Sequence, residues 1–249
     1  MSRKINYADN APIWRFLTGQ MGLYTLQSLI GGLVLVGLGT YIRQQGASLD
    51  NIGLLSLTML PWVLKFMWSG RIERWRYRGS PQRSSSMILL LQSIVLILLA
   101  SLAYSNPVES FFIVLAALLV MVILNATVDI VADGYMIERL QQKDYRLGNL
   151  VQVGGGYCGA AIGGGVFLII AQHWGWFNAI FALTGIGVIL LLTFFTLATQ
   201  TPIKAKRTEQ VAQIAPSLLS AFKRPEIKYI LLFITLCQLG LRLIIGLIG

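Results

Sequence analysis

The sequence predicts an all-α integral membrane protein, and three observations support this fold class. Of the 249 residues, 55% are hydrophobic and only 12% are charged. The apolar residues gather in runs of about twenty, which is the length that a helix needs to cross a hydrocarbon core of about 30 Å. The runs are continuously hydrophobic and lack the apolar–polar alternation of a membrane β-barrel.

Seven runs reach the length of a membrane span, and we expect one helix in each. The first run is too long for a signal peptide and has no small-residue cleavage site after a short apolar core, so it is expected to stay in the mature protein. The expected spans are 16–40, 51–70, 87–104, 110–134, 150–172, 176–198 and 229–249.

Basic residues lie almost entirely in alternate connections between these runs. The second connection carries Arg71, Arg74, Arg76, Arg78 and Arg83, and the fourth carries Arg139, Lys143 and Arg146. Further basic residues lie in the N-terminal segment and the sixth connection, whereas the remaining connections contain only Arg43. The positive-inside rule therefore predicts a multi-pass protein of the cell inner (plasma) membrane with a cytoplasmic N-terminus. The net charge of +10 follows from this topology, and no nucleic-acid partner is expected.

The first run contains a polar stripe formed by Gln20, Tyr24 and Gln27, at positions i, i+4 and i+7. Such a stripe can form hydrogen bonds with a polar solute, which makes these residues candidates for substrate binding. Hydrogen bonding between helices explains the pattern equally well, and both interpretations stay open.

The second run contains one cation, Lys65, and the fourth contains two carboxylates, Asp129 and Asp133. Four residues rotate a helix by about 400°, so the two aspartates share a face with Asn125, one turn earlier. Ionisable groups within a span are costly and usually functional, and two close carboxylates can exchange a proton. We therefore expect a proton or substrate site, with a structural polar cluster as the alternative.

Lys65 is the expected partner of Asp129. It precedes Arg71 by six residues, or about 9 Å, and Asp129 precedes Glu138 by nine residues, or about 13 Å, so the two lie at similar depths. The alternative is a lysine whose ammonium group reaches the membrane interface.

The fifth run is rich in glycine, and Gly155 and Gly159 have the spacing of a small-xxx-small motif. Close helix packing is the physical interpretation. A phosphate-binding loop is excluded because no Lys-Ser/Thr pair follows and the glycines lie within a span.

The domain organisation predicted is a six-helix bundle over 1–198, a basic cytoplasmic linker over 199–228, and the first helix of an incomplete second bundle over 229–249. The sequence ends in Leu-Ile-Ile-Gly-Leu-Ile-Gly, without a polar or aromatic flank, which favours a truncated seventh helix. A complete cavity would then need the missing C-terminal half or a second copy.

No catalytic or cofactor site is expected. The single histidine, His173, has no serine–aspartate or metal-ligand arrangement around it, so neither a metal nor another cofactor is predicted. An intramembrane aspartyl protease is the enzyme alternative. It is disfavoured because its Tyr-Asp and Gly-x-Gly-Asp motifs are absent.

Two stretches resemble motifs of the AmpG-like muropeptide and siderophore permease branch of the major facilitator superfamily. Residues 61–68 (PWVLKFMW), followed by Ile-Glu-Arg at 72–74, resemble its second helix and the loop after it. Residues 127–135 (TVDIVADGY) resemble the signature of its fourth helix. The chain departs from the usual pattern at three positions: Gly70 replaces proline, Glu73 replaces aspartate, and Val128 replaces the glutamine before the first aspartate.

The resemblance implies half of a twelve-helix secondary transporter that works by alternating access. It implies symport of protons with a bulky polar solute, a muropeptide or a siderophore, and the Pro-Trp pair leans toward the siderophore group. Asp129, Asp133 and Lys65 would then couple protons to transport. The alternative from another class is a noncatalytic membrane scaffold or a regulatory remnant of a transporter.

Overall fold

The computed structural model describes residues 13–77 and 82–199, together with positions 229, 232, 233 and 236. The chain divides into two compact units, Met1–Arg207 and Thr208–Gly249, and the fold described below is that of the first. The expected linker (199–228) and seventh helix (229–249) lie outside the described residues, apart from Thr199 and the four single positions.

The first span is one long helix with a π-helical segment inside it. It consists of α1 (Ile13–Gly32), the π-helix η2 (Leu33–Leu38) and α2 (Gly39–Gln44). It exceeds the expected 16–40 at both ends.

The second span is broken, whereas the sequence predicted one continuous helix over 51–70. It comprises α3 (Leu49–Leu55), the 3-10 helix η3 (Ser56–Met59), α4 (Leu60–Leu64) and α5 (Phe66–Tyr77). The axis bends by 47° at Lys65. Pro61 lies in the first turn of α4 and supplies no backbone N–H, so the helical ladder is already interrupted there. At the bend the Lys65 carbonyl accepts hydrogen bonds from the backbone N–H groups of Trp68 (3.2 Å) and Ser69 (3.0 Å).

The third and fourth spans are uninterrupted helices, α6 (Arg83–Leu102) and α7 (Phe111–Arg139). α7 continues past the expected end at residue 134, so Glu138 and Arg139 belong to its last turn and are buried. The prediction that Arg139 lies in a loop is therefore wrong.

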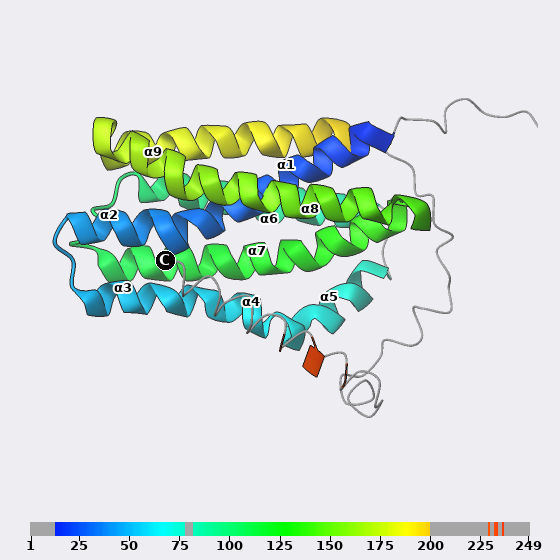
Figure 1. The fold of residues 1–249 in the computed structure, drawn as a ribbon, viewed down its shortest axis with the longest axis horizontal. Helices are drawn as coiled ribbons and strands as arrows, with labels where there is room; N and C mark the ends of the chain where they lie inside the picture. The colour runs from blue at the N-terminus through cyan, green and yellow to red at the C-terminus, as the bar shows by residue number, and fades with distance from the viewer. Residues whose placement is uncertain (1–12, 78–81, 200–228, 230–231, 234–235, 237–249) are drawn as a thin grey trace, which may run out of the picture. The chain divides into compact units, whose positions relative to one another are not determined.

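The fifth and sixth spans follow each other almost without a loop. After η4 (Gln142–Asp144), the chain forms α8 (Tyr145–Ala161), the π-helix η5 (Ile162–Val166), α9 (Phe167–Thr193) and the π-helix η6 (Phe194–Ala198). The chain turns back within α9 at Gly175, where φ is +80° and ψ is 172° (Figure 1). This break separates the expected spans 150–172 and 176–198.

The described residues contain four helices long and apolar enough to cross a membrane, and the bent second span makes a fifth. The longest of these, Gln142–Ala198, supplies two crossings because it turns back at Gly175. Six crossings and no described strand confirm the predicted class, an all-α membrane protein.

Glycines of α8 and of the following η5 make the contact with α1, and the sequence predicted such close packing without indicating the partner helix. Gly155, Gly159 and Gly163 face α1 at intervals of four residues, and we call these three the glycine seam. A Cβ atom at Gly159 would collide with the Thr25 carbonyl, and one at Gly163 with the Leu29 carbonyl. The missing side chains therefore allow the two backbones to touch.

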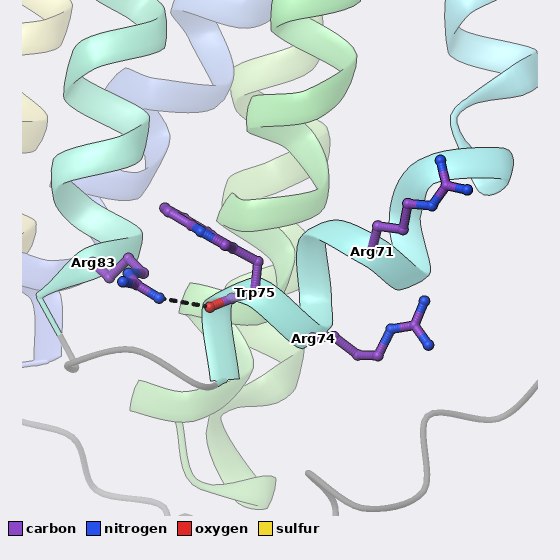
Figure 2. Close-up of a pocket in the computed structure, with 4 residues that line it drawn as sticks. All are labelled: Arg71, Arg74, Trp75 and Arg83. Carbon is purple, nitrogen blue, oxygen red and sulfur yellow. Dashed lines mark hydrogen bonds between the residues drawn. The ribbon is translucent and has the colours of Figure 1, made fainter.

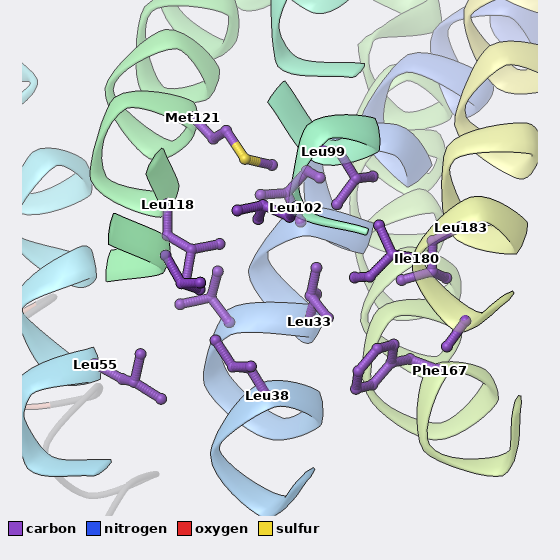
Figure 3. Close-up of a cluster of buried hydrophobic side chains, with 14 of the residues drawn as sticks. Leu33, Leu38, Leu55, Leu99, Leu102, Leu118, Met121, Phe167, Ile180 and Leu183 are labelled. Atoms are coloured by element: carbon purple, nitrogen blue, oxygen red, sulfur yellow. The ribbon is translucent and has the colours of Figure 1, made fainter. Parts of the chain in front are cut away.

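Apolar side chains fill the half of the bundle away from the arginine-rich helix ends. Leu33 and Leu38 of η2 lie against Phe167 and Ile180, with Leu118 of α7 on the other side (Figure 3). A second apolar cluster, around Tyr24 and Tyr135, occupies the other half. The candidate site lies beside that second cluster.

Candidate functional site

α7 places Asp129 and Asp133 one turn apart on a face that meets other helices of the bundle. Asp129 is buried and Asp133 is partly exposed. Both lie well inside the apolar helix, so neighbouring polar groups must replace the water that they would otherwise bind. The neighbours come from three other helices.

The break in the second span brings Lys65 to Asp129. The Lys65 ammonium forms an ion pair with Asp129 Oδ2, as the depths of the two residues in the sequence predicted. The Lys65 side chain is 34% exposed and that of Asp129 is 11% exposed, so the pair lies at the edge of the bundle. The ammonium also lies 5.5 Å from the centre of the Trp62 ring, within reach of a cation–π contact.

Asp133 binds two neutral donors from the two helices that form the glycine seam. Its Oδ1 accepts hydrogen bonds from the Tyr24 hydroxyl (2.9 Å) on α1 and from Gln152 Nε2 (3.1 Å) on α8. Together with the ion pair, these contacts join α1, the second span, α7 and α8. We call Tyr24, Lys65, Asp129, Asp133 and Gln152 the carboxylate cluster.

The other predicted binding residues lie apart from this cluster. Gln20 and Gln27 are buried, and the Gln20 amide has no hydrogen-bond partner among the described residues. Asn125 is also buried, and its Oδ1 accepts a hydrogen bond from Gln92 Nε2 on α6 (3.0 Å). Thus Tyr24 makes the interhelical contact that was the alternative interpretation of the stripe. A role in substrate binding stays a prediction for these residues.

Sequence reasoning missed Gln152 and Gln92, although both interrupt apolar or glycine-rich runs. Gln152 lies three residues before Gly155, and a Cβ at Gly155 would lie 3.0 Å from the Tyr24 Cβ. The glycine spacing therefore indicated that the face of α8 near Gln152 packs closely against another helix, and the structure shows that this helix is α1. Gln92 is a single amide in the apolar stretch of α6, which is itself a signal of an interhelical hydrogen bond.

A second charged group, also missed, joins α5 to the end of α7. Arg76 is 1% exposed and pairs with Glu73 (Nη2–Oε2, 2.7 Å) and with Glu138 (Nη1–Oε1, 2.8 Å). Gly134 leaves room for it, since a Cβ there would lie 2.5 Å from Arg76 Nη2. The sequence analysis placed Arg76 in the connection after the second span, which is wrong because α5 continues through it and Arg76 contacts Glu138 on α7.

The carboxylate cluster has the chemistry of a proton-dependent contact. Among the described residues, Lys65 forms an ion pair with Asp129 and the hydrogen bonds to Asp133 come from neutral donors. Binding one proton would take Lys65, Asp129 and Asp133 together from one net negative charge to none. No group of three metal-ligating side chains occurs among the described residues. The described residues therefore place two carboxylates, one of them paired with a lysine, where a proton can bind.

Comparisons with known proteins connect the chain to a permease. It is 29% identical over 175 residues to an uncharacterized protein of Haemophilus influenzae, a match that covers 70% of this chain and 40% of that protein. It is 26% identical over 207 residues to the anhydromuropeptide permease of Escherichia coli strain K12, covering 82% of this chain and 41% of the permease. No protein-family model and no solved structure matches. The chain thus spans about two-fifths of the length of these relatives, and the second of the two is named as a permease.

Proposed function

We propose that this bundle is one half of a proton-coupled secondary transporter that imports a bulky polar solute across the inner membrane. The observation that carries the proposal is the Lys65–Asp129 ion pair beside Asp133, at the edge of a multi-pass membrane bundle. The similarity to a permease supports transport as the activity.

The solute in this proposal is a muropeptide or a siderophore. The similarity to an anhydromuropeptide permease favours the muropeptide. The Pro-Trp pair at 61–62 favours the siderophore instead. Both solutes are large and polar, so a cavity between two bundles suits either one.

In the proposed mechanism a proton from outside neutralises Asp129, and Lys65 then loses its ion pair with that carboxylate. The second span can then move relative to α7, while Asp133 keeps its hydrogen bonds to Tyr24 and Gln152. Release of the proton on the cytoplasmic side restores the ion pair. The second wall of the cavity comes from a C-terminal half or from a second copy of the chain, and the N-terminus is cytoplasmic.

The test is accumulation of radiolabelled anhydromuropeptide and of a ferric siderophore in energised membrane vesicles that contain the complete transporter. Asp129→Asn keeps the side-chain volume but cannot ionise, so we expect loss of uphill accumulation while downhill exchange survives. Asp50→Asn is the matched control, because Asp50 is exposed in the first turn of α3 and should leave accumulation unchanged.

Three outcomes contradict parts of this proposal. Accumulation by Asp129→Asn at the wild-type rate would make the aspartates structural. Uptake of neither solute by the wild type would exclude both solute classes and favour the noncatalytic scaffold. Saturable uptake by a monomer of these 249 residues would refute the need for a second wall.

A further inference from the structure

Three arginines and a tryptophan line a cavity of about 420 Å³ where α5 ends and α6 begins. Arg71, Arg74 and Trp75 come from α5, and Arg83 is the first residue of α6 (Figure 2). We call these four residues the arginine pocket. Its volume lies within the range of about 300–1,000 Å³ that is typical of small-ligand sites.

The charge of the arginine pocket is not balanced. Among the described residues, Arg71, Arg74 and Arg83 have no carboxylate within ion-pair distance, and no acidic residue lines the cavity. The nearest acidic residue in the sequence, Glu73, is paired with Arg76. Three guanidinium groups without a counter-ion indicate an anionic ligand, and arginine binds phosphate oxygens with two parallel hydrogen bonds.

Two of the four residues already hold each other in place. The Arg83 guanidinium donates a hydrogen bond to the Trp75 carbonyl oxygen (3.1 Å) and lies 4.3 Å from the centre of the Trp75 ring (Figure 2). Arg71 and Arg74 are one helical turn apart, and their exposed side chains extend from the same side of α5. The pocket therefore combines a fixed aromatic–cation pair with two adaptable cations.

The surroundings favour a lipid as the source of the phosphate. Arg83 begins a membrane-spanning helix, and tryptophan is the aromatic residue typical of the membrane interface. Leu90 and Ile97 follow Arg83 at intervals of seven residues, so they continue its helix face, and they are 62% and 68% exposed. An acyl chain can lie along this apolar face with its headgroup at the arginines.

We propose that the arginine pocket binds the phosphate headgroup of an anionic phospholipid whose acyl chain lies on the exposed face of α6. The phosphodiester binds at Arg83, beside the Trp75 ring, and Arg71 and Arg74, whose side chains extend away from that pair, attract the headgroup through their charge (Figure 2). The site is separate from the carboxylate cluster and does not depend on what the protein transports.

The test is native mass spectrometry of the full chain in detergent with added phosphatidylglycerol, or with phosphatidylethanolamine as the zwitterionic reference. Arg71→Gln/Arg74→Gln removes two charges of the pocket. Lys143→Gln/Arg146→Gln is the matched control, because it removes two exposed charges near the start of α8, outside the pocket. Each arginine near a membrane surface contributes about 1 kcal/mol, so we expect phosphatidylglycerol to bind the pocket variant at least about tenfold more weakly.

The expected pattern is that wild type and control retain phosphatidylglycerol over phosphatidylethanolamine and only the pocket variant loses it. An equal loss of phosphatidylglycerol binding in both double variants would show that net charge alone determines binding, and it would overturn the proposed site. Displacement of phosphatidylglycerol by millimolar inorganic phosphate would overturn the lipid assignment in favour of a soluble phosphate. Leu90→Gln leaves the arginines intact and should by itself weaken the binding of phosphatidylglycerol. Unchanged binding by this variant would overturn the proposed path of the acyl chain.

Discussion

The contact of α8 with α1 and the contact of the second span with α7 join helices by opposite means. At the glycine seam the backbone of α1 touches that of α8 and the following η5 at three glycines spaced four residues apart. Between the second span and α7, long side chains join the helices through the ion pairs Lys65–Asp129 and Arg76–Glu138. The Trp68 indole N–H adds a hydrogen bond to the Thr127 hydroxyl (3.2 Å).

This difference indicates which part of the bundle can move. Two helices whose backbones touch fit together closely in one position. Sliding one helix along the other would lose these contacts along the whole glycine seam. Flexible charged side chains can exchange partners when a proton or a solute arrives. We therefore expect α1 and α8 to behave as one unit and the second span to be the element that changes its contacts.

The largest effect should come from adding a methyl group to the glycine seam. Gly159→Ala places a Cβ against the Thr25 carbonyl and the Leu29 amide nitrogen, and neither backbone group can yield. We expect destabilisation of about 3 kcal/mol or failure to fold, measured by thermal unfolding in detergent and by size-exclusion chromatography.

Gly154→Ala is the matched control for the glycine seam, because no other atom lies within 4 Å of a Cβ at Gly154. This variant should unfold at or slightly above the wild-type temperature, since alanine favours a helix more than glycine does. Identical unfolding temperatures for the two variants would show that the seam is not closely packed in the protein.

A smaller effect should come from Glu138→Gln, at the charged contact. The buried Arg76 loses one of its carboxylates but keeps Glu73, so we expect a loss of about 2 kcal/mol in the free energy of unfolding. Glu109→Gln is the control, since Glu109 is exposed and has no ion pair in the described part of the chain. A loss as small as that of the control would mean that Arg76 is satisfied without Glu138.

The smallest effect should be the coupling between Lys65 and Asp129. Because the lysine is about one-third exposed, solvent screens the pair, and we expect a coupling energy of about 1 kcal/mol or less. The measurement is a double-mutant cycle of Lys65→Met and Asp129→Asn, followed by unfolding. A coupling energy larger than the loss caused by Glu138→Gln would contradict this order and make Lys65–Asp129 the stronger of the two charged contacts.

The sequence predicted the parts of this fold that depend on composition and on residue spacing along one helix. Run length located the first six spans, and the four-residue spacing of Gly155 and Gly159 indicated close helix packing. The Lys65–Asp129 contact was also predicted, because an intramembrane charge requires a partner at similar depth.

The missed features depend on where a helix ends and how it is rotated. Arg76 and Arg139 lie beyond the hydrophobic runs, so their polarity suggested loops, whereas α5 and α7 continue through them. The bend at Lys65 was missed because the span was predicted from hydrophobicity alone, although Pro61 indicated an interrupted hydrogen-bond ladder. Gln152 was missed because its partner, Tyr24, lies on another helix.

The turn at Gly175 has a consequence for how the protein is made. Within the 57 residues of Gln142–Ala198, two crossings are separated by one residue outside helical geometry. Because this link is so short, the fifth crossing cannot move far into the lipid while the sixth is still in the translocation channel. The fifth and sixth crossings are thus expected to leave the insertion machinery together as a helical hairpin, already paired when they reach the lipid.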